Sequence, residues 1–253
     1  MNKGNVWLVG AGPGDAGLIT VKGLRCIQSA DVIVHDRLVN PELIAQVPDH
    51  CEIINVGKEH DYHPIPQEAI NQILVKHAQA GKQVVRLKGG DPYVFGRGGE
   101  EAEVLAQHGI KFEIVPGISS SIGGLAYAGI PVTHRNYASS FHVVTGHTSQ
   151  DNAQQNWEIL AQLEGTLIIL MGMTRLEEIC QQLMLYGKSP ATPAAVIMYA
   201  SQPKQKSVIG TLETLAAKVE EQNLHAPALI VIGEVVNLGA TLSFLPLTEQ
   251  FNE

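Results

Sequence analysis

The sequence has few cysteines, and this shortage limits the kinds of site that it can contain. Cys26, Cys51 and Cys180 are the only three among 253 residues, and no two of them form a CxxC pair. An odd number of widely separated cysteines predicts reduced thiols, as in a cytoplasmic protein, and argues against a structural zinc site. We therefore expect neither a disulfide framework nor a metal.

Positive charge is also scarce. The chain has 17 lysines and arginines against 25 aspartates and glutamates, which gives a formal net charge of −8. Binding to nucleic acid phosphates in general requires clustered basic residues, so we expect no nucleic acid partner. An anionic ligand would have to be held by a local basic pocket.

The sequence lacks a continuous apolar segment suited to a membrane. Its longest uncharged stretch, Ile114 to Thr133, has roughly the 20 residues of a membrane-spanning helix, but prolines, glycines and three consecutive serines interrupt it. We predict a buried turn followed by a helix there, and no association with a membrane. Met1-Asn2-Lys3 leads directly into a strand-like run, and no secretory signal is visible.

Short β-branched runs alternate with helical segments over the first half of the chain. Strands are predicted at 6–9, 31–34, 52–56, 83–87 and 111–115, and helices at 18–29, 67–80 and 99–107. Gly81 and Gly109 fall where helices end. This alternation predicts a parallel sheet covered by helices, in which ligands bind beyond the carboxyl ends of the strands.

The second half has a different pattern. Strands are predicted at 141–144, 166–171, 194–198, 206–209 and 228–232, and helices at 156–163, 175–186 and 212–221. The strands at 194 and 206 leave no room for a helix between them, so part of this sheet is predicted to be antiparallel. The fold class is α/β, with an N-terminal domain over 1–117 containing a mostly parallel sheet and a C-terminal domain over 118–253 containing a mixed sheet.

A glycine-rich loop, Val9 to Asp15, follows the first predicted strand. It does not match the dinucleotide-binding pattern, because Asp15 stands where that pattern has its third glycine and Pro13 lacks a backbone N–H. A tight turn would explain the glycines alone. Gly-Pro-Gly-Asp together favours a functional loop, and a nicotinamide-dependent oxidoreductase stays an alternative.

A second loop, Arg86 to Glu101, is the most informative segment. Five glycines, Pro92 and two aromatic residues lie between the end of a predicted strand and the start of a helix, which is more than a surface connection requires. Glu100 and Glu101 complement the dipole of the following helix, so that helix end is not suited to a phosphate. Glycines beside Asp91 suit a neutral or cationic ligand.

Three neighbouring strand ends supply polar side chains. Asp36, Lys58 and Asp91 each follow a predicted strand of the first sheet and so converge on one side of it. Taken singly, Asp36 is explained as a turn residue and Lys58 as a solvated one, and their convergence favours a site. His60 and His63 lack the further ligands of a metal site and are expected to be exposed loop residues.

Small and basic residues follow near the expected domain boundary. Gly117-Ile118-Ser119-Ser120-Ser121 opens a helix, where one hydroxyl caps the helix and the others are free to touch a ligand. Arg135 and His147 lie on either side of the predicted strand at 141. The chain contains no GxSxG elbow, so a serine hydrolase triad is not supported.

Read in order, several of these segments resemble the signature series of the tetrapyrrole methylase family. They are Val9 to Asp15, Gly89 to Glu101 (GGDPYVFGRGGEE), Val115 to Ser120, Gly129 to Arg135, Thr145 to His147 and Met171-Gly172. The resemblance runs from about Asn5 to Val236 and is greatest to members that C-methylate uroporphyrinogen III. It implies two α/β domains with the active site in the cleft between them, a homodimer, S-adenosylmethionine as cosubstrate, and a monofunctional chain.

The resemblance also implies roles for individual residues. The cofactor contacts carried over are Pro13, Gly89, Gly90, Asp91, Val94, Ser119, Ser120, Met171 and Ala200. Asp36 matches the proton acceptor and Lys58 the proton donor. Because the family's substrate carries many carboxylates, we expect Arg37, Arg97, Arg135 and His147 to hold it. Ser119-Ser120 and Tyr199-Ala200-Ser201 depart from the common Thr-Ala and glycine at these places.

The implied reaction is methylation of uroporphyrinogen III on rings A and B, which gives precorrin-2 through precorrin-1 for sirohaem or cobalamin. The alternatives within the family are methylation of a later precorrin, of a ribosomal RNA cytidine or of a modified histidine. A noncatalytic tetrapyrrole carrier is a further alternative. The acidic charge disfavours RNA, and the GGDPYVFGRGGEE string favours uroporphyrinogen.

Overall fold

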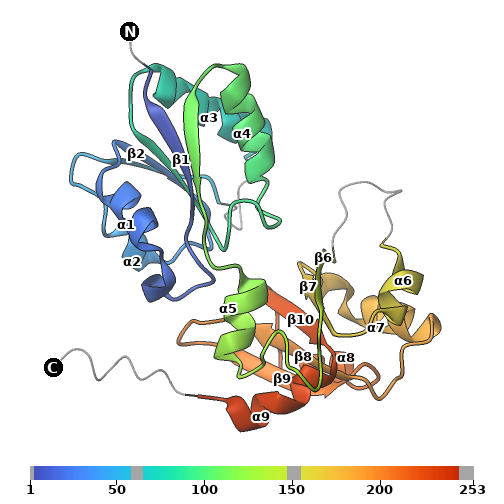
Figure 1. Cartoon of the computed structure of the whole chain (residues 1–253). Coiled ribbons are helices and arrows are strands. Elements are labelled where there is room, and N and C mark those ends of the chain that lie inside the picture. Colours follow the sequence, from blue (N-terminus) through green and yellow to red (C-terminus); the bar gives the residue numbers. More distant parts are fainter. Residues whose placement is uncertain (1–2, 58–64, 147–154, 245–253) are drawn as a thin grey trace, which may run out of the picture. The chain divides into compact units, whose positions relative to one another are not determined.

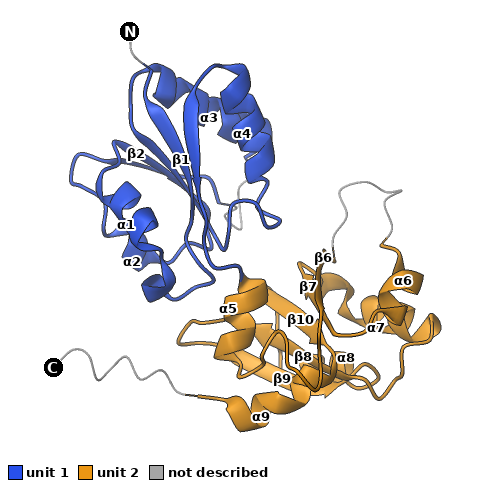
Figure 2. Ribbon diagram, viewed as in Figure 1, with its two compact units in different colours: residues 1–119 blue, residues 120–253 orange. Residues whose placement is uncertain are grey.

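A computed structural model describes residues 3–57, 65–146 and 155–244 of the chain. The chain divides into two compact units, Met1–Ser119 and Ser120–Glu253 (Figure 2). Each unit contains one five-stranded sheet. The predicted α/β class, with a parallel first sheet and a mixed second sheet, is confirmed.

All the strands of the first sheet are parallel (Figure 1). They are β1 (Asn5–Gly10), β2 (Val32–His35), β3 (Glu52–Asn55), β4 (Val84–Lys88) and β5 (Lys111–Val115). Their order across the sheet is β3-β2-β4-β1-β5. Because β2 and β4 are neighbours and parallel, the residues that follow them emerge at the same edge of the sheet.

Helices cover both faces of this sheet (Figure 1). Those on one face are α3 (Gln67–Gln79) and α4 (Gly98–Gln107), and those on the other are α1 (Val21–Gln28) and α2 (Pro41–Ile44). Successive strand residues point to opposite faces. Val84 therefore shares a core cluster with Leu74 of α3, whereas Val85 shares another with Ile27 of α1.

Two helices of the first unit differ from the prediction. The segment predicted as one helix over 18–29 is a 3₁₀ turn (Ala16–Leu18) followed by α1. Asp15 caps the turn by accepting from the N–H of Gly17, and Thr20 caps α1 by accepting from the N–H of Gly23. The short helix α2 was not predicted, because a single turn gives no helical period in the sequence.

The second sheet is mixed. Its strands are β6 (Phe141–Thr145), β7 (Thr166–Leu170), β8 (Pro193–Met198), β9 (Lys206–Thr211) and β10 (Ala228–Ile232), in the order β6-β7-β10-β8-β9. β6 and β7 are parallel, and the other pairs are antiparallel, as predicted for β8 and β9. Since β10 runs opposite to both β7 and β8, the carboxyl ends of β6, β7 and β8 lie at one edge.

Two layers of helices enclose the second sheet. α6 (Trp157–Gln162), α7 (Leu176–Leu185) and α8 (Leu215–Glu221) pack on one face, and α5 (Ser120–Tyr127) with the 3₁₀ segment Glu234–Leu238 packs on the other. A short helix, α9 (Gly239–Leu242), and a 3₁₀ turn (Met173–Arg175) complete the unit. α8 begins three residues after its predicted start, because β9 continues to Thr211.

The stretch Ile114 to Thr133 contains the end of β5, an irregular segment over 116–119 and α5. The predicted helix is confirmed, but the segment before it is not the predicted buried turn, because it has no turn geometry and Pro116 is exposed. Over the described residues, no helix has the length and apolar character needed to cross a bilayer. The C-terminal residues Phe251 to Glu253, predicted to form a loose tail, lie outside the described part of the chain.

Candidate functional site

Three loops of the first unit meet in close contact beyond the carboxyl ends of β1, β4 and β5. Gly12 and Gly90 form an isolated antiparallel bridge, with N···O distances of 3.2 and 2.8 Å. A Cβ on Gly117 would lie 2.3 Å from the carbonyl oxygen of Gly90, and one on Gly10 would lie 2.5 Å from the Cα of Gly117. Glycine is therefore required at Gly10 and Gly117 for the loops to pack this closely.

Asp91 fastens two of these loops to each other. Its Oδ2 accepts from the N–H of Gly117 at 3.0 Å, and its Oδ1 accepts from the N–H of Tyr93 at 2.8 Å. Asp91 is half-buried, and no lysine or arginine side chain among the described residues of the first unit forms an ion pair with it. We call the three contacting loops, which follow β1, β4 and β5, the glycine loops. The predicted cofactor residue holds these loops together and brings to them a carboxylate that has no basic ion-pair partner among the described residues of this unit.

The loop after Asp91 exposes apolar side chains on a strained backbone. The apolar side chains of Tyr93, Val94 and Phe95 are all exposed to solvent. A loop that only connected two elements would not need them at its surface. Phe95 and Arg97 have φ values of 52° and 58°, in the left-handed region that costs free energy for residues other than glycine. Exposed apolar groups and backbone strain together are typical of a ligand-binding loop.

Gly89 and Pro13 are the chain neighbours of Gly90 and Gly12, which form the bridge between two of the glycine loops. Only the Cβ of Leu38, at 3.6 Å, lies near the position of a Cβ on Gly89, so the loop is open there. Pro13 is half-buried between Gly12 and Gly14. The N–H of Gly90 donates to Gly12, so it is not available to a ligand, whereas its Cα surface is.

A chain of charged side chains lies behind the end of β2. Arg86 donates from Nη2 to Oδ1 of Asp36 at 2.5 Å and from Nε to Oε1 of Glu101 at 2.9 Å. Lys88 donates from Nζ to the same Glu101 oxygen at 3.0 Å. The Arg86 side chain is only 2% exposed and that of Glu101 is fully buried, whereas that of Asp36 is 34% exposed. We call these four residues the Arg86 cluster.

Glu101 is the centre of the Arg86 cluster. Its Oε1 also accepts from Nε2 of Gln67 at 3.2 Å, so three donors converge on one oxygen. Oε2 of Glu101 is buried and has no hydrogen-bond partner among the described residues. Glu101 was predicted to complement the dipole of α4. It also neutralises two buried cations, which its sequence position does not reveal.

The protonation of the two cations follows from their surroundings. Burial lowers the pKa of Lys88, and the neighbouring charge of Arg86 lowers it further, while Glu101 and Asp36 only partly oppose them. Burial would also lower the pKa of Arg86, but the charges of Asp36 and Glu101 outweigh it, so that pKa is raised. Arg86 is therefore a permanent cation of the cluster.

The predicted basic residues are not all free. Arg97 makes a bidentate pair with Glu100, at 2.9 Å from Nε and 2.7 Å from Nη2. Arg37 and Arg135 are exposed. Lys58 and His147, like His60 and His63, lie outside the described residues.

The remaining predicted contacts follow strand ends or the start of α5. In the second unit, Met171 comes directly after β7 with φ 55°, and its side chain is 53% exposed. Ala200 follows β8 and is 7% exposed. It packs closely on α5, because a Cβ added to Gly124 of that helix would lie 2.9 Å from the Cβ of Ala200. Ser119 is buried at the end of the first unit, and Ser120 begins α5 and is half-buried.

The roles of Arg86, Lys88 and Glu101 were not predicted from the sequence. A signal was present, because Arg86 and Lys88 are two residues apart in an otherwise apolar run and so point to one face of a buried strand. Two cations on the covered face of a central strand require acidic partners. The identity of those partners depends on how α4 packs, which the sequence does not specify.

Two further features bear on ligands. Among the described residues, no group of three or more histidine, cysteine, aspartate or glutamate side chains could hold a metal ion.

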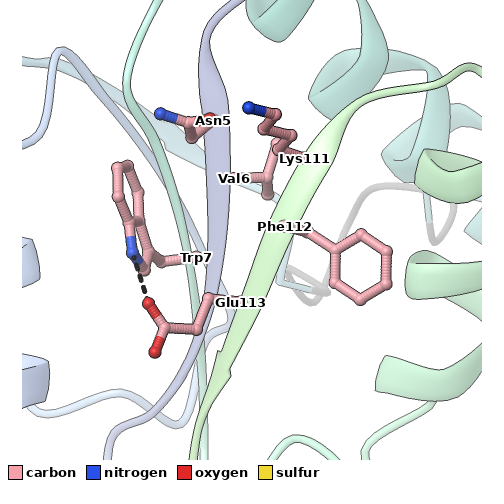
Figure 3. Close-up of a pocket in the computed structure, with 6 residues that line it drawn as sticks. All are labelled: Asn5, Val6, Trp7, Lys111, Phe112 and Glu113. Atoms are coloured by element: carbon pink, nitrogen blue, oxygen red, sulfur yellow. Dashed lines mark hydrogen bonds between the residues drawn. The ribbon is translucent and has the colours of Figure 1, made fainter.

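A shallow pocket of about 170 Å³ lies at the edge strand β5, beside the Trp7 to Glu113 hydrogen bond of 3.3 Å (Figure 3). None of the predicted site residues lines this pocket.

Comparison with known proteins gives consistent matches over most of the chain. The sequence model of the tetrapyrrole (corrin/porphyrin) methylases matches residues 5–216. A uroporphyrinogen-III C-methyltransferase of Priestia megaterium is 54% identical over 235 residues, which cover 92% of this chain and 99% of that protein. A siroheme synthase of Acinetobacter baylyi is 49% identical, over 96% of this chain and 53% of that protein. The chain thus spans about half the length of the siroheme synthases that it matches.

A solved structure extends the comparison to three dimensions. Uroporphyrin-III C-methyltransferase from Thermus thermophilus, complexed with S-adenosylhomocysteine, is 40% identical and superimposes with a TM-score of 0.80, covering 93% of this chain and 94% of that one. Together with the sequence match over residues 5–216, this likeness shows that the chain belongs to the tetrapyrrole methylase family.

Proposed function

We propose that the protein transfers methyl groups from S-adenosylmethionine to rings A and B of uroporphyrinogen III and so forms precorrin-2 through precorrin-1, for sirohaem or cobalamin. The observation that carries this proposal is the 54% identity to a uroporphyrinogen-III C-methyltransferase over 99% of that protein's length. The S-adenosylhomocysteine complex of the Thermus thermophilus relative supports the choice of donor.

The glycine loops of the first unit fit such a donor. S-adenosylmethionine supplies an electrophilic methyl group on a cationic sulfur. Asp91 offers a carboxylate that forms no ion pair among the described residues of this unit, and Gly89 offers an open backbone surface. Pro13 and the exposed Val94 supply apolar contact area. We assign Gly90, Ser119, Ser120, Met171 and Ala200 to donor binding as well, as the resemblance implies.

The proposed methyl acceptor, uroporphyrinogen III, requires a base to take up a proton and cations to bind its carboxylates. Methylation of a pyrrole carbon leaves the macrocycle with a proton to lose, and Asp36, half-buried directly after β2, is assigned to accept it. Lys58 is assigned to protonate the macrocycle elsewhere. Four basic residues, Arg37, Arg97, Arg135 and His147, are assigned to the substrate carboxylates. We further propose that the protein acts as a homodimer in the cytoplasm and without a metal.

The test is to count the methyl groups added. The purified protein is incubated without oxygen with uroporphyrinogen III and S-adenosylmethionine, and the product is analysed by mass spectrometry. We expect two methyl groups per macrocycle, with one S-adenosylhomocysteine released for each. Methylation of a later precorrin but not of uroporphyrinogen III would contradict the proposed substrate, and binding without release of S-adenosylhomocysteine would identify a carrier.

A further inference from the structure

The Arg86 cluster connects the fully buried carboxylate of Glu101 to the half-buried carboxylate of Asp36, which is assigned to catalysis. Arg86 of β4 lies between them, with one nitrogen on each. Its third nitrogen, Nη1, lies 3.4 Å from the carbonyl oxygens of Val34 and Leu87. Every nitrogen of the guanidinium therefore has a partner, and the group cannot rotate without breaking several contacts.

The partners of Arg86 are themselves fixed. Glu101 is fully buried in the first turn of α4 and accepts from Arg86, Lys88 and Gln67. Val34 and Leu87 belong to neighbouring parallel strands. A rigid planar fork held in this way fixes the directions of the two N–H bonds on Nη2. One of them donates to Oδ1 of Asp36.

We propose that Arg86 is a positioning residue for the reaction, which fixes one oxygen of Asp36 so that the other is held ready to accept the proton that leaves the methylated macrocycle. The bond from carbon to that proton breaks, its electron pair stays on the macrocycle, and the proton binds Oδ2 of Asp36. The inference rests on the proposed function, because it assigns Arg86 to the base step of that reaction.

The geometry distinguishes Arg86 from a residue that only supplies charge. Asp36 follows the last residue of β2, and its side chain is one-third exposed, so without a partner its carboxylate would sample several rotamers. Misplacement of a catalytic group by about 1 Å can cost on the order of 100-fold in rate. A lysine at position 86 would keep the charge but not the fork that reaches both Glu101 and Asp36.

The experiment is Arg86→Lys, with methyl transfer measured per S-adenosylhomocysteine-binding site so that only folded protein is counted. We expect kcat to fall by about 10- to 100-fold, with KM for uroporphyrinogen III and the affinity for S-adenosylhomocysteine changed by less than about twofold. The matched control is Arg25→Lys, the same exchange at an exposed position of α1, which we expect to keep the unaltered rate.

A double substitution tests whether Arg86 acts through Asp36. If it does, Arg86→Lys combined with Asp36→Asn is no slower than Asp36→Asn alone, within about twofold. Multiplied losses in the double variant, or a full rate in Arg86→Lys, would overturn the inference while the unaltered protein still methylates its substrate. Absence of methyl transfer by the unaltered protein would instead refute the proposed function, and the inference with it.

A second measurement covers the case in which Arg86→Lys does not fold. The side-chain N–H signals of Arg86 are followed by nitrogen-15 NMR in the unaltered protein and in Asp36→Asn. We expect the Arg86 signals to move when Asp36 changes, because Nη2 donates to it. Arg86 signals that do not respond to Asp36→Asn would overturn the inference.

Discussion

Replacing Asp36 with asparagine lowers the rate of methyl transfer at least about tenfold, because an amide cannot take the proton that the methylated macrocycle must lose. The amide oxygen still accepts from Nη2 of Arg86, so the local structure is kept. We expect S-adenosylhomocysteine binding, measured by titration calorimetry, to be unchanged, since Asp36 is not assigned to the donor. Turnover is measured under saturating donor and substrate.

The control for this substitution lies at the other end of the same strand. Asp31 precedes β2 and accepts from the N–H of Gln83 through Oδ2 at 2.8 Å. Asp31→Asn makes the same chemical change and retains an oxygen for that N–H, so its turnover is expected to equal that of the unaltered protein. Equal turnover in Asp36→Asn and the unaltered protein would remove Asp36 from the chemistry.

Glu101→Gln is expected to cause the largest loss of stability. The substitution removes the only fully buried negative charge of the Arg86 cluster and leaves Arg86 and Lys88, both nearly inaccessible, with the partial compensation of Asp36 alone. Breaking a buried ion pair by removing one partner costs about 3 to 5 kcal/mol of the free energy of unfolding. Denaturation by urea, followed by circular dichroism, measures this loss.

The neighbouring residue provides the control. Glu100 is also acidic and also in the first turn of α4, but its pair with Arg97 is exposed. Exposed pairs are worth about 0.2 to 1 kcal/mol because water screens them. Glu100→Gln is therefore expected to unfold almost as the unaltered protein does. If both glutamine variants had similar stability, the Arg86 cluster would not be the buried charge network described above.

The elements with a clear period were predictable from the sequence. β5 was predicted with the bounds that the structure has, and α3 within one residue, because its apolar positions repeat with the helical period over more than three turns. α2 was not found, although Asn40 and Pro41 are a capping residue and a first-turn proline. A helix of one turn is stabilised by its caps and packing, and leaves no period to detect.

The candidate site was predictable only in part. The end of a strand can be recognised from neighbouring residues in the sequence, whereas side-chain contacts join residues that are far apart in it. The order of β2 and β4 in a parallel sheet places Asp36 and Asp91 at one edge, as predicted. The hydrogen bonds of Asp91 to Gly117 and of Arg86 to Glu101 join residues that are distant in sequence and meet only through tertiary packing. Neither contact has a spacing that the sequence reveals.

The central claim is that the glycine loops of the first unit bind the sulfonium donor. A crystal structure of the protein with S-adenosylhomocysteine tests this most directly. We expect the ligand to contact Gly89, Asp91 and Pro13, with the hydrogen bond from Gly117 to Asp91 intact. A ligand bound away from these loops, for example at the pocket beside Trp7 and Glu113, would contradict the claim.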